Sequence, residues 1–338
     1  MSRQDVLPGL DARSYRRHPL HGEGAIWVEK NCYGDMWIEV LHALQLDPVA
    51  SLAYTLAIDF EDDQWTFFKP PLEDLRDLYG IDVQELTLWR PVVEHAVEHL
   101  AAGKLIAIEV DAFWLPDTAG TDYRQQHTKT TIMLANLDAA AQWLGYFHNA
   151  GYFELAGDNF RQVLRMDDSQ DPARLPPFAE LVRIDRLARR EPAELAARAW
   201  RLLAKHLERR PARNPFERFG ARFAQDLPEL IAGGLPRYHA WAFASVRQAG
   251  AAFELGAAHL RWLAASGRPG LEGAASCFEA IAQGNKTLIL KAARAVNSQR
   301  PLDASALCAD MARAWDEGMQ ALEQSVGAGD ATAPLAHS

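Results

Sequence analysis

The sequence changes in character near residue 178, and this change limits the folds that the chain can adopt. Before it, short apolar runs bounded by Gly, Pro, Asp or Asn predict strands over Leu105–Val110, Thr130–Ala135 and Gln142–Phe147. Apolar residues at helical spacing predict helices over Cys32–Leu46 and Pro91–Ala102. After it, Ala- and Leu-rich segments interrupted by Pro and Gly predict helices almost throughout. We therefore expect an α+β N-terminal domain followed by an all-α helical bundle.

The length of 338 residues, at roughly 150 residues per domain, corresponds to about two domains. Residues 166–177 combine charge, Ser and three prolines, which is typical of a linker. The predicted organisation is an α+β domain over 1–165, this linker, a helical domain over 178–327 and a flexible tail over 328–338.

The composition excludes several classes of protein. With 49% hydrophobic and 24% charged residues, the chain can bury a sizeable core. No run approaches the roughly 18 apolar residues of a membrane span, and the N-terminus has no apolar signal region. The three cysteines match neither a disulfide framework nor a zinc site, which favours a reducing, cytoplasmic location. The net charge of −10 argues against a general nucleic-acid binder.

One segment, residues 180–222, differs from the rest in charge. Its twelve Arg or Lys and six Asp or Glu leave +6, whereas the remainder of the chain carries −16. Two interpretations stay open. The segment is either a solvated helical surface with local ion pairs or a docking surface for an acidic partner.

The strongest chemical signal is Cys32, which stands where an amphipathic helix is predicted to begin. Unpaired N–H groups at a helix N-terminus favour a thiolate and can stabilise an oxyanion beside it. Asn31 and Trp37 flank this cysteine and are candidates for substrate contacts. The alternative is a buried, inert thiol, the interpretation that we apply to Cys277 and Cys308.

A base for such a thiol must come from another part of the fold. His127 lies directly before a predicted strand and 95 residues after the cysteine, a spacing that a Cys–His pair permits. His148 or Asn149, at the end of another strand, is a candidate third member that would orient the imidazole. A β-turn explains the Asn-Ala-Gly sequence at this point equally well.

Other sites are not indicated. The acidic cluster at residues 59–63 lacks the ligand spacing of a calcium loop, and neither HExxH nor paired cysteines occur. Neither GxGxxG nor GxxxxGK[ST] is present. We therefore expect no metal and no cofactor of the protein's own.

Four strings carry a family resemblance: NCYGDMWIEVLHAL, DFEDDQWTFFK, EVDAFWLPDTAG and GYFHNAGYFEL. They are similar to a bacterial domain-of-unknown-function family, number eighteen-thirty-nine (DUF1839), and the resemblance continues through the helical half. More distantly, residues 20–165 resemble the papain-like N-terminal domain of butirosin biosynthesis protein H. In these relatives the residue order is a cysteine followed by a histidine, as with Cys32 and His127 here.

The resemblance implies a papain-like fold of the cysteine-protease type, with Cys32 as nucleophile and His127 as general base. The butirosin relative moves an aminoacyl group from a carrier-protein thioester to an amine. DUF1839 members tend to be encoded near carrier proteins and amino acid:carrier protein ligases. These partners, and the phosphopantetheine arm of the carrier protein, are therefore implied. The third catalytic member stays open between His148 and Asn149, and the Cys32 amide is the one oxyanion donor that we can assign.

The leading hypothesis is Cys–His acyl transfer, by an aminoacyl transferase or thioesterase, from a carrier-protein thioester. Asp111 and Tyr123 would line the pocket, with Asp111 suited to a substrate ammonium group. One alternative is a cysteine peptidase or amidase that uses the same pair. Another is a catalytically silent module that binds a carrier protein.

Overall fold

The computed structural model describes residues 3–167 and 175–330. The chain divides into two compact units. Unit 1 comprises Met1–Glu23, Asn31–Pro48 and Pro71–Arg190, and unit 2 comprises Gly24–Lys30, Val49–Pro70 and Glu191–Ser338. Two segments from the N-terminal half therefore belong to the second unit. Each unit is described by itself.

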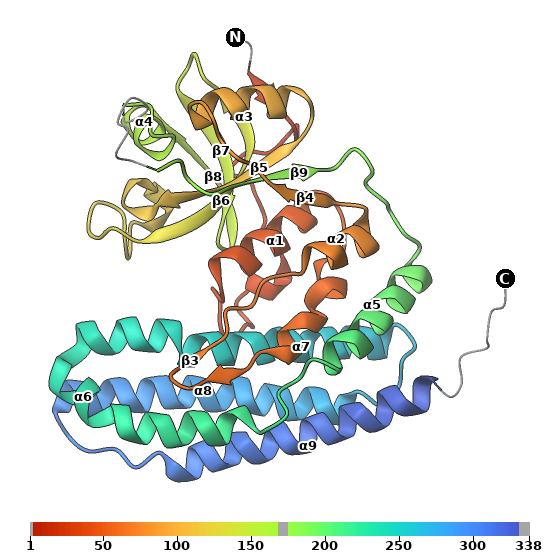
Figure 1. Cartoon of the computed structure of the whole chain (residues 1–338), viewed down its shortest axis with the longest axis vertical. Coiled ribbons are helices and arrows are strands. Elements are labelled where there is room, and N and C mark those ends of the chain that lie inside the picture. Colours follow the sequence, from red (N-terminus) through yellow and green to blue (C-terminus); the bar gives the residue numbers. More distant parts are fainter. Residues whose placement is uncertain (1–2, 168–174, 331–338) are drawn as a thin grey trace. The chain divides into compact units, whose positions relative to one another are not determined.

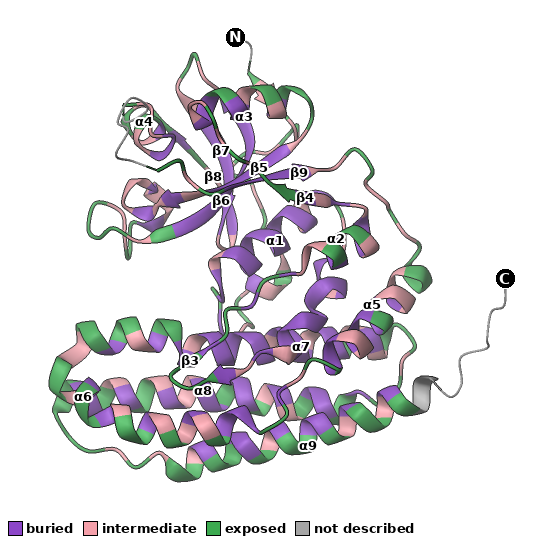
Figure 2. Cartoon of the chain, in the orientation of Figure 1, coloured by how far each residue is buried: buried purple, intermediate pink, exposed green. Residues whose placement is uncertain are grey.

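Unit 1 is built on one antiparallel sheet with the strand order β4-β9-β5-β6-β7-β8, and β1 adds to β6 (Figure 1). The strands are β1 (Gln4–Asp5), β4 (Asp82–Glu85), β5 (Leu105–Asp111), β6 (Lys129–Asp138), β7 (Trp143–His148), β8 (Gly151–Ala156) and β9 (Ala179–Arg183). The three strands predicted from the sequence are confirmed as β5, β6 and β7. They are buried along almost their whole length, which explains why each is a nearly continuous apolar run (Figure 2).

The helices of unit 1 are α1 (Cys32–Ala43), α2 (Leu72–Tyr79), α3 (Val92–Ala101) and α4 (Asp158–Val163). Short 3-10 turns cover Pro19–His21, Ala112–Trp114 and Pro116–Thr118. The two helices predicted from periodicity are confirmed as α1 and α3. Gly103 follows α3 with a φ of 71°, a left-handed conformation that suits glycine at a helix end.

The two faces of the sheet bury different sets of side chains. On one face, alternate residues such as Ile108 and Ile132 form a continuous apolar core with residues of α3 and α4, among them Ala96 and Phe160. On the other face, α1 contacts β6, β7 and β8. The sheet thus separates an apolar core from the side that carries Cys32.

Unit 2 is mainly helical. Its elements are a 3-10 segment that lies largely in this unit (Pro48–Ala57), β2 (Phe60–Glu61), β3 (Gln64–Trp65), α5 (Pro192–Leu207), α6 (Pro215–Ala244), α7 (Val246–Ala265), α8 (Glu272–Ser298) and α9 (Ser305–Asp330). The long helices α6 to α9 pack side by side (Figure 1). Helix α6 contains a kink at Gly234, where φ is 73°.

Helix α7 packs closely because its glycines leave room for large neighbours. A Cβ atom on Gly250 would lie 2.6 Å from ring atoms of Trp27. A Cβ atom on Gly256 would lie 2.3 Å from Leu56. Both contacts lie within unit 2, and they give a packing role to the small residues of this helix.

The predicted class is confirmed in its coarse form: a mixed helix-and-sheet part is followed by a helical C-terminal part. The predicted domain boundary is wrong. Strand β9 follows the predicted linker and pairs with β5 and β4, so unit 1 continues to Arg190. Most of the predicted linker, residues 168–174, lies outside the described residues, as does the tail from residue 331. Among the described helices, none is long and apolar enough to cross a membrane.

Candidate functional site

Cys32 is the first residue of α1, and the local sequence explains why the helix starts there. Asn31 is the N-cap, and its Oδ1 atom accepts hydrogen bonds from the N–H groups of Tyr33 and Gly34 at 3.0 and 3.1 Å. Asp35 accepts a bond from the Asn31 N–H group at 3.1 Å. Cys32 is a partly exposed free thiol. Within the described residues its thiol and its own N–H group have no hydrogen-bond partner, so this N–H group remains a donor for an oxyanion.

His127 is held by a carboxylate. Its Nδ1 atom lies 2.6 Å from Oδ2 of Asp111, and its side chain is 71% exposed. The Asp111 side chain is fixed in turn by a bond from the N–H group of Phe113, and the His127 ring stacks on the Phe113 ring with 4.4 Å between centroids. A proton on Nδ1 that is donated to the carboxylate leaves Nε2 as the basic nitrogen. This is the orientation that a general base requires.

Strand register places this pair on the face of the sheet that α1 covers. Tyr33 of α1 donates a hydrogen bond of 2.7 Å to Glu180 of β9, and Glu180 is the cross-strand partner of Ala107 in β5. Side chains alternate along a strand, so Asp111, four residues after Ala107, is on the same face. Cys32 and the His127–Asp111 pair thus share one side of the sheet, but no hydrogen bond joins the two among the described residues.

His148 belongs to the opposite face. Its Nε2 atom lies 2.8 Å from Oγ1 of Thr130, the cross-strand partner of Val110, which is part of the apolar core. Its Nδ1 atom lies 2.6 Å from Oδ2 of Asp117, whose other oxygen accepts a bond from Tyr146. This buried network ties the loop between β5 and β6 to β7.

Neither of the two alternative residues predicted to orient the general base forms a hydrogen bond with His127 among the described residues. His148 bonds to Thr130 and Asp117, whereas Asn149 has a φ of 44° in the turn between β7 and β8. The structure places Asp111 on the imidazole of His127 instead.

Besides Asp111, three residues are predicted to contact substrate, and they differ in accessibility. The side-chain oxygen of Asn31 caps α1, and Trp37 is only 2% exposed. Tyr123 is partly exposed, and its hydroxyl accepts a hydrogen bond of 3.1 Å from Asn159. That bond, and next the contact with Arg124, lower the pKa of the Tyr123 hydroxyl.

A buried charge cluster fixes α1 from the side of the N-terminal segment. The two ring nitrogens of His21 face carboxylates of α1: Nε2 lies 3.0 Å from Asp35, and Nδ1 contacts Glu39. All three side chains are fully buried. Both ring nitrogens thus face carboxylate oxygens, an arrangement that suits a doubly protonated imidazole donating from each nitrogen. Tyr15 donates to the second Glu39 oxygen at 2.6 Å, so this cluster anchors the helix that presents Cys32.

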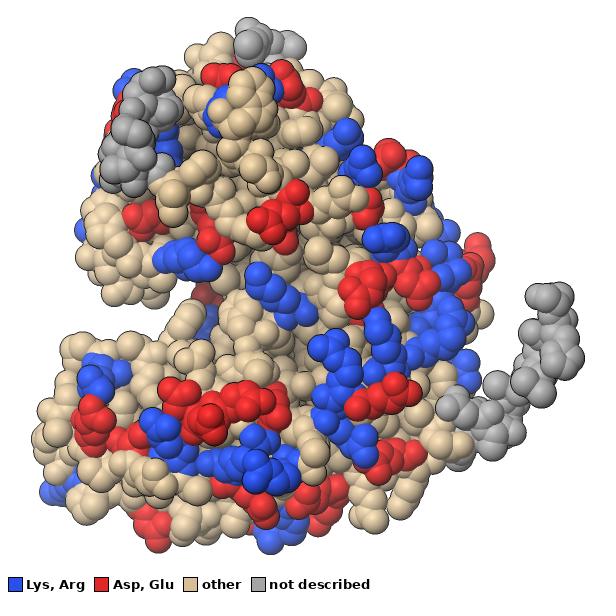
Figure 3. Space-filling view, in the orientation of Figure 1, with Lys and Arg blue, Asp and Glu red and all other residues tan. Residues whose placement is uncertain are grey.

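The basic segment 180–222 is largely paired. In unit 2, Arg198 and Arg222 each bond a carboxylate four residues away, at 3.0 and 2.8 Å. In unit 1, Arg189 and Arg190 donate to backbone carbonyl oxygens. Figure 3 shows Lys and Arg side chains gathered on the right-hand part of the drawn face, with Asp and Glu side chains interspersed among them. The solvated interpretation of this segment is thus favoured over an open basic docking surface.

Comparison with models of protein families identifies the family of the chain. The model of the DUF1839 N-terminal domain matches residues 16–184, and that of the DUF1839 C-terminal domain matches residues 192–324. The chain belongs to the DUF1839 family. No curated protein matches this DUF1839 chain. The boundary between the two domain models agrees with the structural boundary near residue 190.

The described part of this DUF1839 protein holds no group of three or more His, Cys, Asp or Glu suited to a metal ion. The sequence HAVEH of α3 places His95 and His99 one turn apart, their rings stacked with 6.2 Å between centroids. Glu98, between them, is paired with Arg90. Two histidines without a third ligand do not make up a zinc site.

The histidine partners of two carboxylates were not predicted from the sequence. Asp111 is predicted above as a contact for a substrate ammonium group, and the structure adds its contact with the imidazole of His127. Asp117, the partner of His148, is not identified by the sequence. Its position in the loop between two predicted strands, in the same string as Asp111, is the one signal that could have indicated it.

Proposed function

We propose that the protein transfers acyl groups through a thioester on Cys32, with His127 as general base. The observation that carries the proposal is the 2.6 Å contact between His127 Nδ1 and Asp111, on the side of the sheet where α1 begins with Cys32. A cysteine, a histidine and an orienting carboxylate are the parts that covalent acyl transfer needs.

The steps follow from these atoms. Nε2 of His127 takes the proton of the Cys32 thiol, and the sulfur attacks the carbonyl carbon of an aminoacyl thioester. The resulting oxyanion accepts a hydrogen bond from the unpaired N–H group of Cys32. The thiol of the substrate then leaves with the proton from His127. An amine or water, deprotonated by His127, attacks the enzyme thioester and releases Cys32.

The absence of a Cys32–His127 hydrogen bond is compatible with this mechanism, because catalytic contacts often form only when substrate is bound. The loop that carries His127 is anchored at Asp117 by the buried His148 network. We propose that this anchoring limits the loop to small movements, and that substrate binding brings the imidazole to the sulfur.

A papain-like arrangement is part of the proposal. It is supported by the chain order of Cys32 and His127, and by a cysteine at the start of a helix packed on an antiparallel sheet. The similarity to butirosin biosynthesis protein H stays a prediction. The proposed acyl donor is a carrier protein with a phosphopantetheine thioester, charged by an amino acid:carrier protein ligase. A cytoplasmic location, which keeps the nucleophilic thiol reduced, is also proposed.

The experiment measures the intact mass of the protein after incubation with an aminoacyl-pantetheine thioester. We expect an aminoacyl adduct on the wild type and on Cys277→Ala, and none on Cys32→Ala. An adduct that persists in Cys32→Ala would exclude this nucleophile. Cleavage of a small peptide amide by the wild type without any carrier thioester would favour a peptidase or amidase.

One observation favours a second candidate, a silent module that binds a carrier protein: Cys32 has no hydrogen bond to a base among the described residues. This function requires an unactivated thiol. The rate of Cys32 alkylation as a function of pH distinguishes the two. A profile equal to that of a free cysteine, unaffected by His127→Ala, would favour the binding module.

A further inference from the structure

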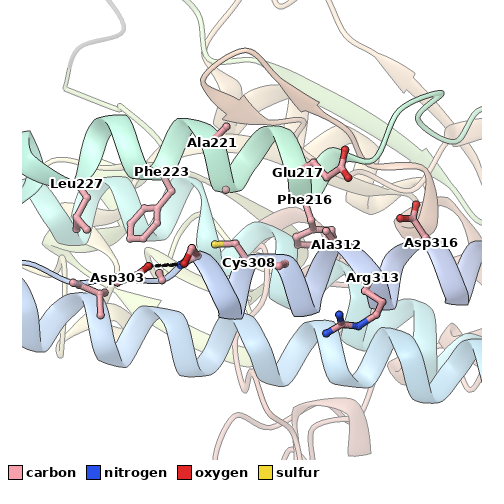
Figure 4. Close-up of a pocket in the computed structure, with 16 residues that line it drawn as sticks. Phe216, Glu217, Ala221, Phe223, Leu227, Asp303, Cys308, Ala312, Arg313 and Asp316 are labelled. Atoms are coloured by element: carbon pink, nitrogen blue, oxygen red, sulfur yellow. Dashed lines mark hydrogen bonds between the residues drawn. The ribbon is translucent and has the colours of Figure 1, made fainter.

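Unit 2 contains a groove that the proposed function does not use. It lies between α6 and α9 and has a volume of about 670 Å³ (Figure 4). The apolar part of its lining includes Phe216, Phe223, Leu227, Cys308 and Ala312. Sites for small molecules usually have volumes of about 300–1,000 Å³ and apolar linings with a few polar groups.

The groove exists because small residues line both helices. Gly220 of α6 faces Cys308 of α9, and a Cβ atom on Gly220 would lie only 2.9 Å from Cys308 Cβ. Ala224 and Ala309 also line the groove and are exposed to solvent. The two helices thus approach closely at one point and leave a hollow beside it, with the almost fully buried residues Phe216 and Phe223 at its floor.

Charged side chains at the rim are mostly acidic. Glu217, Asp303 and Asp316 line the groove together with one cation, Arg313. Arg313 is itself paired with Asp310. The Asp303 carboxylate accepts bonds from the N–H and hydroxyl groups of Ser305.

Two of these carboxylates stand out. In the described part of the chain, Glu217 and Asp316 form no ion pair. Figure 4 shows them at the same end of the groove, one on each helix. A ligand that lies on the aromatic floor would therefore bring its end group near two carboxylates.

We propose that this groove binds an amphiphilic organic cation, with an alkyl or aryl body on the floor and an ammonium group beside Glu217 and Asp316. The acidic rim repels anions, and it offers a neutral apolar molecule no charge interaction. An ammonium group gains attraction from both carboxylates while its body leaves water. The site is independent of Cys32 and His127.

Calorimetric titration of the full-length protein with three ligands of equal chain length tests the proposal: octyltrimethylammonium, 1-octanol and octanesulfonate. We expect the cation to bind most tightly and the sulfonate most weakly. Removal of one carboxylate, by Glu217→Gln or Asp316→Asn, should weaken binding of the cation about two- to fivefold, the range of an exposed charge pair. Neither substitution should change the affinity for octanol.

Glu317→Gln is the matched control, because this neighbouring residue of α9 is exposed and does not line the groove. It should leave all affinities unchanged. Ala309→Trp fills the groove from its exposed rim and should abolish binding of the cation. Equal affinity for cation and octanol, or cation binding that survives Ala309→Trp, would overturn the proposal.

Cys308 supplies a second measurement. Burial raises the pKa of its thiol to about 11, so its alkylation is slow and requires access through the groove. Saturation with octyltrimethylammonium should slow alkylation of Cys308 severalfold and leave Cys277 unaffected. Unchanged alkylation of Cys308 at a saturating concentration of the cation would place the binding site elsewhere and overturn the proposal.

Discussion

Replacement of His21 by alanine tests whether the buried charge cluster holds α1 in place. The imidazole lies between the carboxylates of Asp35 and Glu39, and all three side chains have no solvent exposure. His21→Ala removes the imidazole between the two carboxylates and leaves both of them buried. One must take up a proton or become solvated, and either costs free energy.

The free energy of unfolding of unit 1 should fall by about 3–5 kcal/mol, the range for a buried ion pair that loses one partner. A domain of this size loses about 2–4 °C in melting temperature per kcal/mol. His21→Ala should therefore lower the melting temperature of unit 1 by roughly 10 °C. The double variant His21→Ala/Glu39→Gln should be more stable than the single variant, because it removes the repulsion between the two carboxylates.

Hydrogen exchange of the amides of α1 is the suitable assay, because it reports on unit 1 separately from unit 2. The control is His239→Ala, since His239 is exposed on α6, and it should change stability by less than about 0.5 kcal/mol. The reasoning would be refuted if His21→Ala lowered the free energy of unfolding by less than about 1 kcal/mol. It would also be refuted if the double variant were no more stable than the single variant.

Three further predictions concern packing, pH and catalysis. Gly250→Ala places a Cβ atom 2.6 Å from the Trp27 ring and should destabilise unit 2 by about 1–3 kcal/mol. Gly273→Ala meets no atom within 4 Å in helix α8 and should stabilise it by about 0.5–1 kcal/mol. Urea unfolding measures the stability of both variants, and an equal loss of stability in Gly250→Ala and Gly273→Ala would contradict the packing argument. Burial lowers the pKa of His259 to about 4. The folded-state pKa is below the unfolded value of about 6.5, so the unfolded state binds the proton more readily. The free energy of unfolding is therefore not reduced by His259 above pH 6.5, and it falls by about 3 kcal/mol as the pH decreases towards 4. His259→Leu should flatten that part of the pH profile of unfolding, and an unchanged profile would assign the dependence to other groups. Asp111→Asn should leave the melting temperature nearly unchanged and slow acylation of Cys32 about 10²–10⁴-fold, as measured by single-turnover mass spectrometry. Wild-type acylation in this variant would remove Asp111 from the mechanism.

Local features of the fold were predictable because they depend on neighbouring residues. Three strands were recognisable as short apolar runs between Gly, Asp and Asn, because these strands are buried on both faces. The start of α1 was recognisable as well, since its N-cap, Asn31, precedes Cys32 directly. The domain boundary was not recognisable from the sequence. Strand β9 follows the linker-like sequence, and its place in the sheet depends on pairing with β5, which lies more than 70 residues earlier.

The sequence by itself determined three strands and two helices of the first part, the helical character of the second part, and Cys32 and His127 as candidates for chemistry. Tertiary structure alone decided which carboxylate holds the imidazole. Asp111 ends β5 and Asp117 lies six residues later in the following loop, yet one bonds His127 and the other His148. The reason is the alternation of side chains across a sheet: strand register, which long-range pairing sets, assigns each histidine to one face and thereby selects its partner.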